Sequence, residues 1–395
     1  MATKAQIDEL LSRGVDEVII AKDLRQKLLS GKPLRVKHGV DPTGKDLHIG
    51  YAVVYWKLRE LQEMGHKIIF LIGSFTARFG DPTDKTEMRK MRTKEDVERE
   101  AENYINQVGK ILDLKKTEIR YNSEWYDKMS AEGLLRIMSE FTVARMLERD
   151  MFQDRMAKEK DISLHEIVYP VLQGYDSVEL ESDLTVIGTD QKFNELQARP
   201  LQKSRGQVPQ DIITVPMLVG TDGKEKMGQS LDNYIGITEA PNEKFGKVMS
   251  IPDEAIPNYY ELAARASQKK VEEVEKRLKT EENPRDIKLD LASDIVKLYH
   301  GEKAAKGAKV EFLKVFTDKE KPSEIPEKRI KPGPMKLVDL LVEIDLAASK
   351  SEARRLVEQG GVRIDDKVIK NWQQEIEVTP GIILQVGRRK FTKIS

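Results

Sequence analysis

Two short stretches near the start of this chain carry residues of the kind that bind anions. DPTG at 41–44 follows a β-branched, apolar-rich run, and HIG at 48–50 opens an amphipathic stretch. The pattern predicts a strand, a turn and a helix N-terminus. Unpaired backbone N–H groups and the positive end of the helix dipole favour phosphates there. An ordinary strand-to-helix turn with one exposed histidine is the alternative, because an isolated H-x-G is a weak motif.

A basic loop is expected at 74–92, after the apolar run 68–73. It contains Thr76, Arg78, Asp81, Lys85, Arg89, Lys90 and Arg92. Loops beyond the carboxyl ends of parallel strands are where open α/β sheets bind ligands, so this loop is a candidate phosphate clamp. A solvated charged loop explains the same composition. The Gly- and Lys-rich stretch 218–230 is a further loop and is weakly informative alone.

A phenol, an amide and a carboxylate are expected on one helix face. Ser163 and Glu166 form a capping box. Tyr169, Gln173 and Asp176 follow at positions i, i+4 and i+7, which share a face. This face is either a polar pocket wall or, equally, a packing aromatic beside a carboxylate that pairs with a surface lysine.

The elements that must position these residues read as an α/β fold. Strands are expected at 34–40, 68–73, 117–121, 184–187 and 212–215, and helices at 51–64, 93–112 and 131–156. The first strand, the helix after it and the second strand form a βαβ unit. GTDQKF at 188–193 repeats the design of a strand, a glycine turn and polar residues at a helix start. From about 239 to 317 the pattern is helical, and the stretch 318–334 is rich in proline and charge, as linkers are.

Composition excludes several classes of protein. Lysine and arginine together number 67, as do aspartate and glutamate, so net charge favours no partner. With 34% charged and 39% hydrophobic residues the chain fits a globular protein. The absence of cysteine removes disulfides, thiolate metal sites and cysteine nucleophiles. The first residues read as a charged helix without an apolar signal core, and no run approaches bilayer length, so we expect a cytoplasmic protein without membrane contact.

The last 60 residues or so predict a small unit of mixed structure. Helices are expected at 337–344 and 350–359, and strands at 362–364 and 382–386. Basic side chains gather on the second helix and after the turn that follows it: Lys350, Arg354, Arg355 and Arg363. Clustered arginines of this kind form a phosphate-binding footprint for RNA. A solvated helix is the alternative.

Together these stretches resemble the class I aminoacyl-tRNA synthetases, and among them the tyrosyl-tRNA synthetases of bacterial type. The likeness covers nearly the whole chain and rests on ordered motifs: D-P-T before H-I-G, F-T-A-R-x-G-D-P, Y-x-x-x-Q-x-x-D, G-T-D-Q-K-F-N and K-M-x-x-S. It implies a Rossmann-like parallel-sheet catalytic domain over 1–235. A helical anticodon-region domain over 236–325 and a small α+β RNA-binding domain over 332–395 follow.

The resemblance also implies roles for single residues. The catalytic ones are Thr43, His48, Lys85, Arg89 and Lys226. ATP contacts fall on Gly39, Asp41, His48, Gly50, Tyr51, Gly188, Asp190, Lys226 and Met227. Tyrosine contacts fall on Lys37, Asp81, Tyr169, Gln173, Asp176 and Gln191, with Asp176 accepting the substrate phenol. RNA contacts fall on Lys350, Arg354, Arg355 and Arg363.

Partners and cofactors follow from the same resemblance. The substrates are L-tyrosine, tRNA(Tyr) and ATP, with Mg²⁺ held mainly by the ATP phosphates. No protein-bound metal and no organic cofactor are expected. The relatives are homodimers, and the apolar residues of the stretch 125–155 could supply the interface: Leu134, Leu135, Ile137, Met138, Phe141 and Met146. A helix buried within one chain would have the same pattern.

Three positions depart from the family pattern. Tyr51 stands where H-I-G-H has its second histidine, and Gln229 replaces the second lysine of K-M-S-K-S. Lys37 replaces a phenol-contacting tyrosine of one bacterial branch. The first two departures motivate a second hypothesis, a synthetase-like RNA-binding protein with weakened catalysis. A tryptophanyl relative is a third, against which Asp176 and the terminal domain argue.

Overall fold

The computed structural model describes residues 2–81, 92–280, 282–316, 325–387 and 390–395. The chain forms two compact units, Met1–Ala305 and Lys306–Ser395. Each unit has its own sheet and its own core, so each is treated separately below. The expected boundary between a catalytic and a helical domain at 235/236 lies inside the first unit and stays a prediction.

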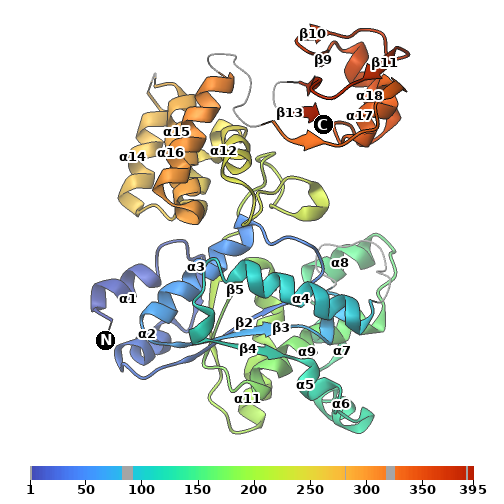
Figure 1. The fold of residues 1–395 in the computed structure, drawn as a ribbon. Helices are drawn as coiled ribbons and strands as arrows, with labels where there is room; N and C mark the ends of the chain where they lie inside the picture. Colours follow the sequence, from blue (N-terminus) through green and yellow to red (C-terminus); the bar gives the residue numbers. More distant parts are fainter. Residues whose placement is uncertain (1, 82–91, 281, 317–324, 388–389) are drawn as a thin grey trace. The chain divides into compact units, whose positions relative to one another are not determined.

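The first unit is built on a six-stranded sheet (Figure 1). Its strands are β1 (Glu17–Ile19), β2 (Arg35–Val40), β3 (Lys67–Ile72), β4 (Thr117–Tyr121), β5 (Leu184–Gly188) and β6 (Asp211–Val215). Their order in the sheet is β1-β6-β5-β2-β3-β4. The pairs from β6 to β4 are parallel and β1 pairs antiparallel with β6. The expected parallel α/β sheet is therefore confirmed, whereas β1 was not predicted.

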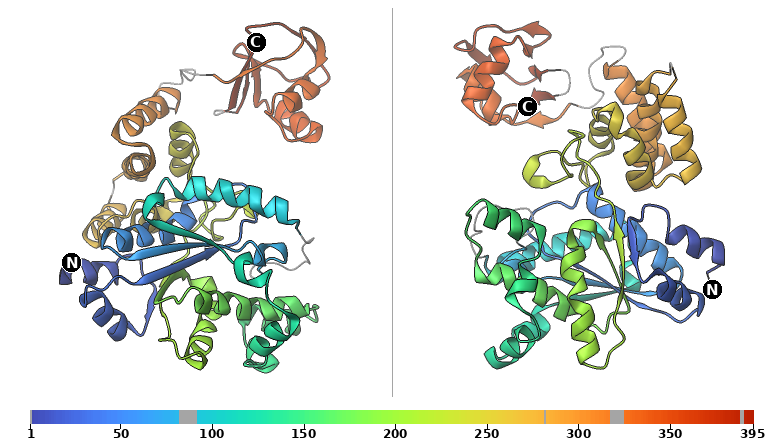
Figure 2. Two further views of the ribbon diagram at one scale, coloured as in Figure 1. Left: turned by 60° about the horizontal axis from the view of Figure 1, so that its bottom comes forward. Right: turned by 180° about the vertical axis from the view of Figure 1, so that it is seen from behind.

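Helices cover both faces of this sheet, as Figures 1 and 2 show. On one side lie α3 (Ile49–Glu63) and α4 (Lys94–Val108), and on the other α9 (Leu164–Glu179) and α11 (Ala198–Ser204). This arrangement explains why β3 reads as an unbroken apolar run: all of its residues after Lys67 are buried. The helix joining β2 to β3 completes the expected βαβ unit.

The helix α9 is positioned at both its start and its middle. Ser163 and Glu166 form the capping box that the sequence predicts. At Gly174 the backbone of α11 comes so close that an added Cβ would lie 2.9 Å from the backbone nitrogen of Ala198. Only glycine allows this approach, so α9 and α11 pack backbone against backbone.

Short helices complete the described part of the first unit up to β6. They are α1 (Lys4–Leu10), α2 (Ala21–Leu29), α5 (Ser123–Tyr126), α6 (Ala131–Met138), α7 (Val143–Met146), α8 (Asp150–Ala157) and α10 (Lys192–Leu196). The stretch expected to supply a dimer interface is thus four short helices. Two of its expected interface residues, Ile137 and Met146, are instead buried within the chain against Val171, Val178 and Leu201. That part of the interface prediction is wrong, because helical periodicity does not show which neighbour an apolar face meets.

From Pro241 onward the described residues of the first unit are mainly helical, as expected. The helices are α12 (Pro241–Met249), α13 (Ile256–Asn258), α14 (Gln268–Leu278), α15 (Pro284–His300) and α16 (Glu302–Phe316), which runs past the unit boundary. Trp56 of α3 donates its indole N–H to the hydroxyl of Tyr299 on α15 at 3.3 Å. This contact ties the helical part to the sheet part of the same unit.

The second unit is a small α+β body. Its elements are β7 (Glu327–Lys328), β8 (Gly333–Lys336), α17 (Leu337–Glu343), α18 (Lys350–Glu358), β9 (Val362–Ile364), β10 (Lys367–Val368), β11 (Glu375–Val378), β12 (Ile383–Val386) and β13 (Lys390–Ile394). The strands pair in the order β10-β9-β12-β13-β7, and β11 pairs with β8. Both expected helices and both expected strands are present. None of the helices in the described part of the chain has the length and apolar content needed to cross a bilayer.

Candidate active site

A cleft of about 840 Å³ opens where β2 and β5 end. In chain order, the strands run from β2 through β3 to β4 on one side and from β5 to β6 on the other side. The point between β2 and β5 is therefore a topological switch point, where open α/β sheets bind ligands. The cleft is lined by all expected catalytic, ATP and tyrosine residues that the structure describes: Lys37, Gly39, Asp41, Thr43, His48, Gly50, Tyr51, Asp81, Tyr169, Gln173, Asp176, Gly188, Asp190, Gln191, Lys226 and Met227. Lys85 and Arg89 lie outside the described residues.

The turn after β2 brings the backbone of α3 to the cleft. His48 is the N-cap residue of α3, and no side chain caps the helix there. Gly50 in the first turn lies so near the imidazole that an added Cβ would be 2.9 Å from His48 Nδ1. Among the described residues, the backbone N–H groups of Ile49 and Tyr51 already donate to the carbonyls of Ile235 and His48, at 2.9 and 3.0 Å. Of the described N–H groups at this helix start, that of Gly50 is the one left for an anionic ligand.

His48 lies in this cleft as a neutral ring. Burial, and then the nearby charge of Lys226, lower the pKa of His48 to about 3. At pH 7 the imidazole therefore offers a hydrogen bond to a ligand and no positive charge. Lys226 places its positive charge near the start of α3. Its Nζ lies 3.4 Å from Asp190 Oδ2. Burial, and then the charge of Asp81, raise the pKa of Asp190 to about 6.

Asp176 forms a buried carboxylate on the wall made by α9. Its Oδ1 accepts the indole N–H of Trp125 at 3.1 Å, and Asn122 Nδ2 lies 3.4 Å from its Oδ2. Burial, opposed by the charge of Lys37, raises the pKa of Asp176 to about 7. The side chain is only 4% exposed, so pairing with a surface lysine is excluded. A buried carboxylate with open acceptor capacity is suited to a ligand hydroxyl.

Acceptor groups gather beside Asp176. Tyr169 donates its hydroxyl to Asp41 Oδ2 at 2.9 Å, which leaves the phenol oxygen free to accept. Gln191 Nε2 donates to Asp81 Oδ2 at 2.9 Å. Together with the amide oxygen of Gln173, these groups could bind an ammonium ion.

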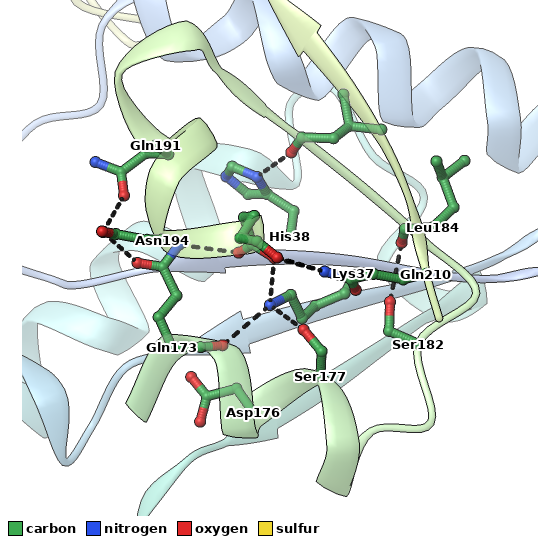
Figure 3. A network of polar contacts seen from close by, with 12 residues as sticks. Lys37, His38, Gln173, Asp176, Ser177, Ser182, Leu184, Gln191, Asn194 and Gln210 are labelled. Carbon is green, nitrogen blue, oxygen red and sulfur yellow. Dashed lines mark hydrogen bonds and ion pairs between the residues drawn. The ribbon is translucent and has the colours of Figure 1, made fainter. Parts of the chain in front are cut away.

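Lys37 was expected to contact the tyrosine substrate, but its Nζ already has three acceptors within the protein. Its Nζ lies 2.9 Å from Glu195, 2.6 Å from the hydroxyl of Ser177 and 3.5 Å from the carbonyl of Gln173 (Figure 3). A direct contact of this ammonium with a substrate phenol stays a prediction.

The loop 226–230 is held in place by polar contacts of its own. Gly228 donates its N–H to Asn233 Oδ1 at 2.8 Å, and Asn233 Nδ2 bonds Asp222 Oδ2 at 2.7 Å. Gln229, which departs from the family pattern, donates its amide to the backbone carbonyl of Asp46. This contact links the loop to the turn before α3.

Tyr51, the other departure in this region, lies against the histidine ring. The centroids of His48 and Tyr51 are 4.3 Å apart. The phenol thus packs against the cleft wall at the start of α3 and also lines the cleft.

The residues expected to bind RNA lie in the second unit. Arg354 places its guanidinium 4.7 Å from the ring centroid of Trp372 and pairs with Glu358 at 2.8 Å. Lys350 pairs with Asp339 at 2.7 Å. Arg355 and Arg363 are exposed. The two helix arginines and the strand arginine are thus on the surface of one small domain.

Four polar residues of the site escaped the sequence analysis: Asn122, Trp125, Asn194 and Glu195. The first two follow β4 at the same sheet edge as the other site residues, and that position was the available signal. Glu195 comes four residues after Gln191, on the same face of the helical segment, but a lone glutamate there normally faces solvent.

Two family models match the chain. One described as tRNA synthetases class I (W and Y) matches residues 29–317, and one described as the tyrosine–tRNA ligase SYY-like C-terminal domain matches residues 318–394. A protein of Mannheimia succiniciproducens named tyrosine–tRNA ligase is 46% identical over 385 residues, which cover 98% of this chain and 97% of the relative. One of Thermotoga maritima with the same name is 47% identical over 388 residues, covering 98% and 96%.

Solved structures have the same fold at lower identity. A C-terminally truncated mitochondrial tyrosyl-tRNA synthetase of Aspergillus nidulans aligns with a TM-score of 0.64 at 20% identity, covering 80% of this chain and 95% of that one. A tyrosyl-tRNA synthetase of Archaeoglobus fulgidus complexed with L-tyrosine gives 0.62 at 23% identity, covering 77% and 99%. These two comparisons concern the fold alone.

Proposed function

Since the chain belongs to the class I tRNA synthetases of the tryptophan and tyrosine type, we propose that it joins tyrosine to tRNA(Tyr) as a tyrosine–tRNA ligase. The enzyme is an aminoacyl-tRNA ligase that uses ATP. The tyrosine carboxylate attacks the α-phosphorus of ATP and the bond to pyrophosphate breaks. A ribose hydroxyl at the 3′ end of the tRNA then takes the tyrosyl group and AMP leaves.

The choice of amino acid is carried by Asp176. Its carboxylate, oriented by Trp125 and Asn122, accepts the hydroxyl of the substrate phenol. A site built to pair a hydroxyl rejects the analogue that lacks it, a rule for which tyrosyl-tRNA synthetases are the standard example. Phenylalanine has no hydroxyl to donate to this carboxylate. Asp176 therefore favours tyrosine over phenylalanine.

The reaction needs no enzyme nucleophile. Rate enhancement comes from holding the two substrates in line and from stabilising the charge that grows on the leaving pyrophosphate. The helix start at His48 and Gly50 receives the phosphates, and Lys226 supplies positive charge. Because His48 is neutral, its part is a hydrogen bond. Thr43, Lys85 and Arg89 complete the proposed phosphate contacts.

The amino acid's ammonium lies among acceptors. Tyr169 and Gln173 offer oxygens, and Asp81 offers a carboxylate. Gln191 faces the tyrosine carboxylate, and Gly188 and Asp190 face the ribose of ATP.

Magnesium enters this proposal together with ATP. Within the described ranges, no group of three or more histidine, aspartate or glutamate side chains lies where it could hold a metal. In this proposal the Mg²⁺ is bound mainly to the ATP phosphates, as part of the substrate.

The second unit binds tRNA in this proposal, through Arg354, Arg355, Arg363 and Lys350. A weakened, RNA-binding relative is not supported, because identity near 46% extends over 98% of the chain to proteins named as ligases. We also infer a cytoplasmic homodimer. Exposed apolar side chains near α6 and α9 support the dimer: Leu135 is 62%, Val143 63% and Leu164 82% exposed.

Exchange of labelled pyrophosphate into ATP tests the proposal. We expect exchange that depends on tyrosine and is at least about a thousandfold weaker, in kcat/KM, with phenylalanine or tryptophan. Charging of tRNA(Tyr) transcripts follows with the same enzyme. Tryptophan-dependent exchange above the tyrosine rate would contradict the amino-acid assignment.

A further inference from the structure

A continuous chain of side-chain hydrogen bonds links Glu195 to Asp81 next to the proposed ammonium site. Figure 3 shows the part of this chain that runs from Gln173 through Asn194 to Gln191. Gln173 Nε2 donates to Glu195 Oε1 at 2.9 Å. Asn194 Nδ2 donates to Gln173 Oε1 at 2.9 Å and to Gln191 Oε1 at 3.1 Å. Gln191 Nε2 then donates to Asp81 Oδ2 at 2.9 Å. Three amides thus lie between two carboxylates.

The carboxylate at the inner end is fully buried and paired. Glu195 and Lys37 are each 1% exposed, and their charged atoms are 2.9 Å apart. Gln210 Nε2 donates to the same carboxylate at 2.9 Å. Every group around Glu195 in this network is a donor, so the ionised carboxylate is satisfied and acts as an acceptor only.

Two acceptor-only ends fix the direction of every amide between them. Gln173 must turn its NH₂ toward Glu195, and its oxygen then faces Asn194. Asn194 must in turn give its NH₂ to both glutamines, and among the described residues its own buried oxygen has no partner. An orphaned oxygen is costly, and its presence indicates that the amide direction is imposed by the neighbours.

We propose that Glu195, held by Lys37, is a positioning residue that makes Gln173 present an oxygen, and not an NH₂ group, to the α-ammonium of the substrate. The inference rests on the proposed function. With the amide turned the other way, an N–H donor would face the ammonium, and the two groups would repel. Lys37 therefore contributes to tyrosine binding through Glu195, whereas Tyr169 and Asp81 contact the ammonium themselves.

The replacement Glu195→Gln tests the direction of the chain. An amide at this position is isosteric but brings its own NH₂ toward Lys37, Gln173 or Gln210, all of which are donors. Gln173 is then free to turn. The exposed carboxylate of Glu254 provides the matched control, Glu254→Gln.

Two competing ligands separate positioning from a damaged pocket. One is L-tyrosine, and the other is 3-(4-hydroxyphenyl)propionate, which is tyrosine without its amino group. In Glu195→Gln we expect the KM for tyrosine to rise at least tenfold. The inhibition constant of the desamino acid and the KM for ATP should change less than twofold, as should all three constants in Glu254→Gln.

Other outcomes overturn the inference. Equal weakening of both ligands would mean that Glu195 only supports the pocket, and an unchanged tyrosine KM would mean that the amide direction does not depend on it. If Glu195→Gln fails to fold, the double variant Lys37→Met with Glu195→Gln removes the unpaired cation and is measured instead, with the same expectation. Failure of the wild-type chain to exchange pyrophosphate with tyrosine would refute the proposed function, which is a separate result.

Discussion

Replacing Asp176 by asparagine should stabilise the ligand-free protein at alkaline pH. Burial raises the pKa of Asp176 to about 7 from an ordinary 3.8, which means that folding disfavours the ionised form. An acid with a raised pKa in the folded state costs stability as the pH rises from its unfolded pKa to its folded one. The difference corresponds to about 4 kcal/mol at pH 8, reached in full above pH 7. Asparagine avoids this cost because it stays neutral.

The amide brings a smaller cost of its own. Its NH₂ group would face Asn122 Nδ2, now 3.4 Å from Oδ2. Asn122 cannot turn, because its oxygen accepts the N–H of Phe75 at 2.7 Å and its nitrogen donates to Thr76 at 3.0 Å. A donor facing a donor in a buried site costs about 1–3 kcal/mol. The net gain at pH 8 is therefore about 1–3 kcal/mol.

The pH dependence makes this prediction refutable. At pH 5 the cost of the carboxylate falls to about 2 kcal/mol, which the amide conflict cancels. Thermal unfolding of ligand-free wild type and Asp176→Asn, measured from pH 5 to 8, should therefore show similar midpoints at pH 5 and a higher midpoint for the variant at pH 8. Tyrosine-dependent exchange should be lost in the same variant. A variant that is less stable at every pH, or whose advantage does not grow with pH, would contradict the assignment of Asp176 as a buried carboxylate with a raised pKa.

Four further results are expected. The KM of the wild type for tyrosine should fall about tenfold from pH 6 to 8, because the ionised Asp176 accepts the phenol, and a flat profile would contradict this. Gln229→Lys should raise the activation rate about tenfold relative to wild type while Gln229→Met does not, since a cation near the leaving pyrophosphate stabilises its charge; equal rates would mean that other cations already suffice. Deleting residues 332–395 should weaken tRNA charging and leave tyrosine-dependent exchange within about twofold, because the described ATP and tyrosine residues lie in the first unit; loss of exchange would show that the two units depend on each other. Leu135→Asp should shift the sedimentation of the protein from dimer to monomer, whereas Val310→Asp, also at an exposed apolar position, should not.

The parts of the fold that the sequence predicts are those where one local pattern dominates. The apolar run of β3 and the capping box at Ser163 have no competing interpretation, so the elements lie within a few residues of the expected positions. β1 was missed because it has only three residues, is partly exposed and pairs with a strand nearly 200 positions away. Local patterns carry no information about such a partner.

The sequence also predicts only part of the candidate site. Residues at strand ends and helix starts, such as Asp41 and Asp190, could be assigned to one sheet edge from order alone. The partner of Lys37 could not, since a lysine in a strand and a glutamate in a short helix both read as solvent-facing residues. Only the three-dimensional structure shows that the two are buried together. The directions of the amides between Glu195 and Asp81 follow from that burial.

The glycine contact between α9 and α11 limits how this enzyme could be engineered for bulkier tyrosine derivatives. With Gly174 against the backbone of α11, the wall that carries Tyr169, Gln173 and Asp176 has no space behind it into which it could retreat. Room for a larger substituent must therefore come from trimming side chains on that wall. Because Lys37 and Glu195 depend on each other, a designer would have to exchange them as a pair.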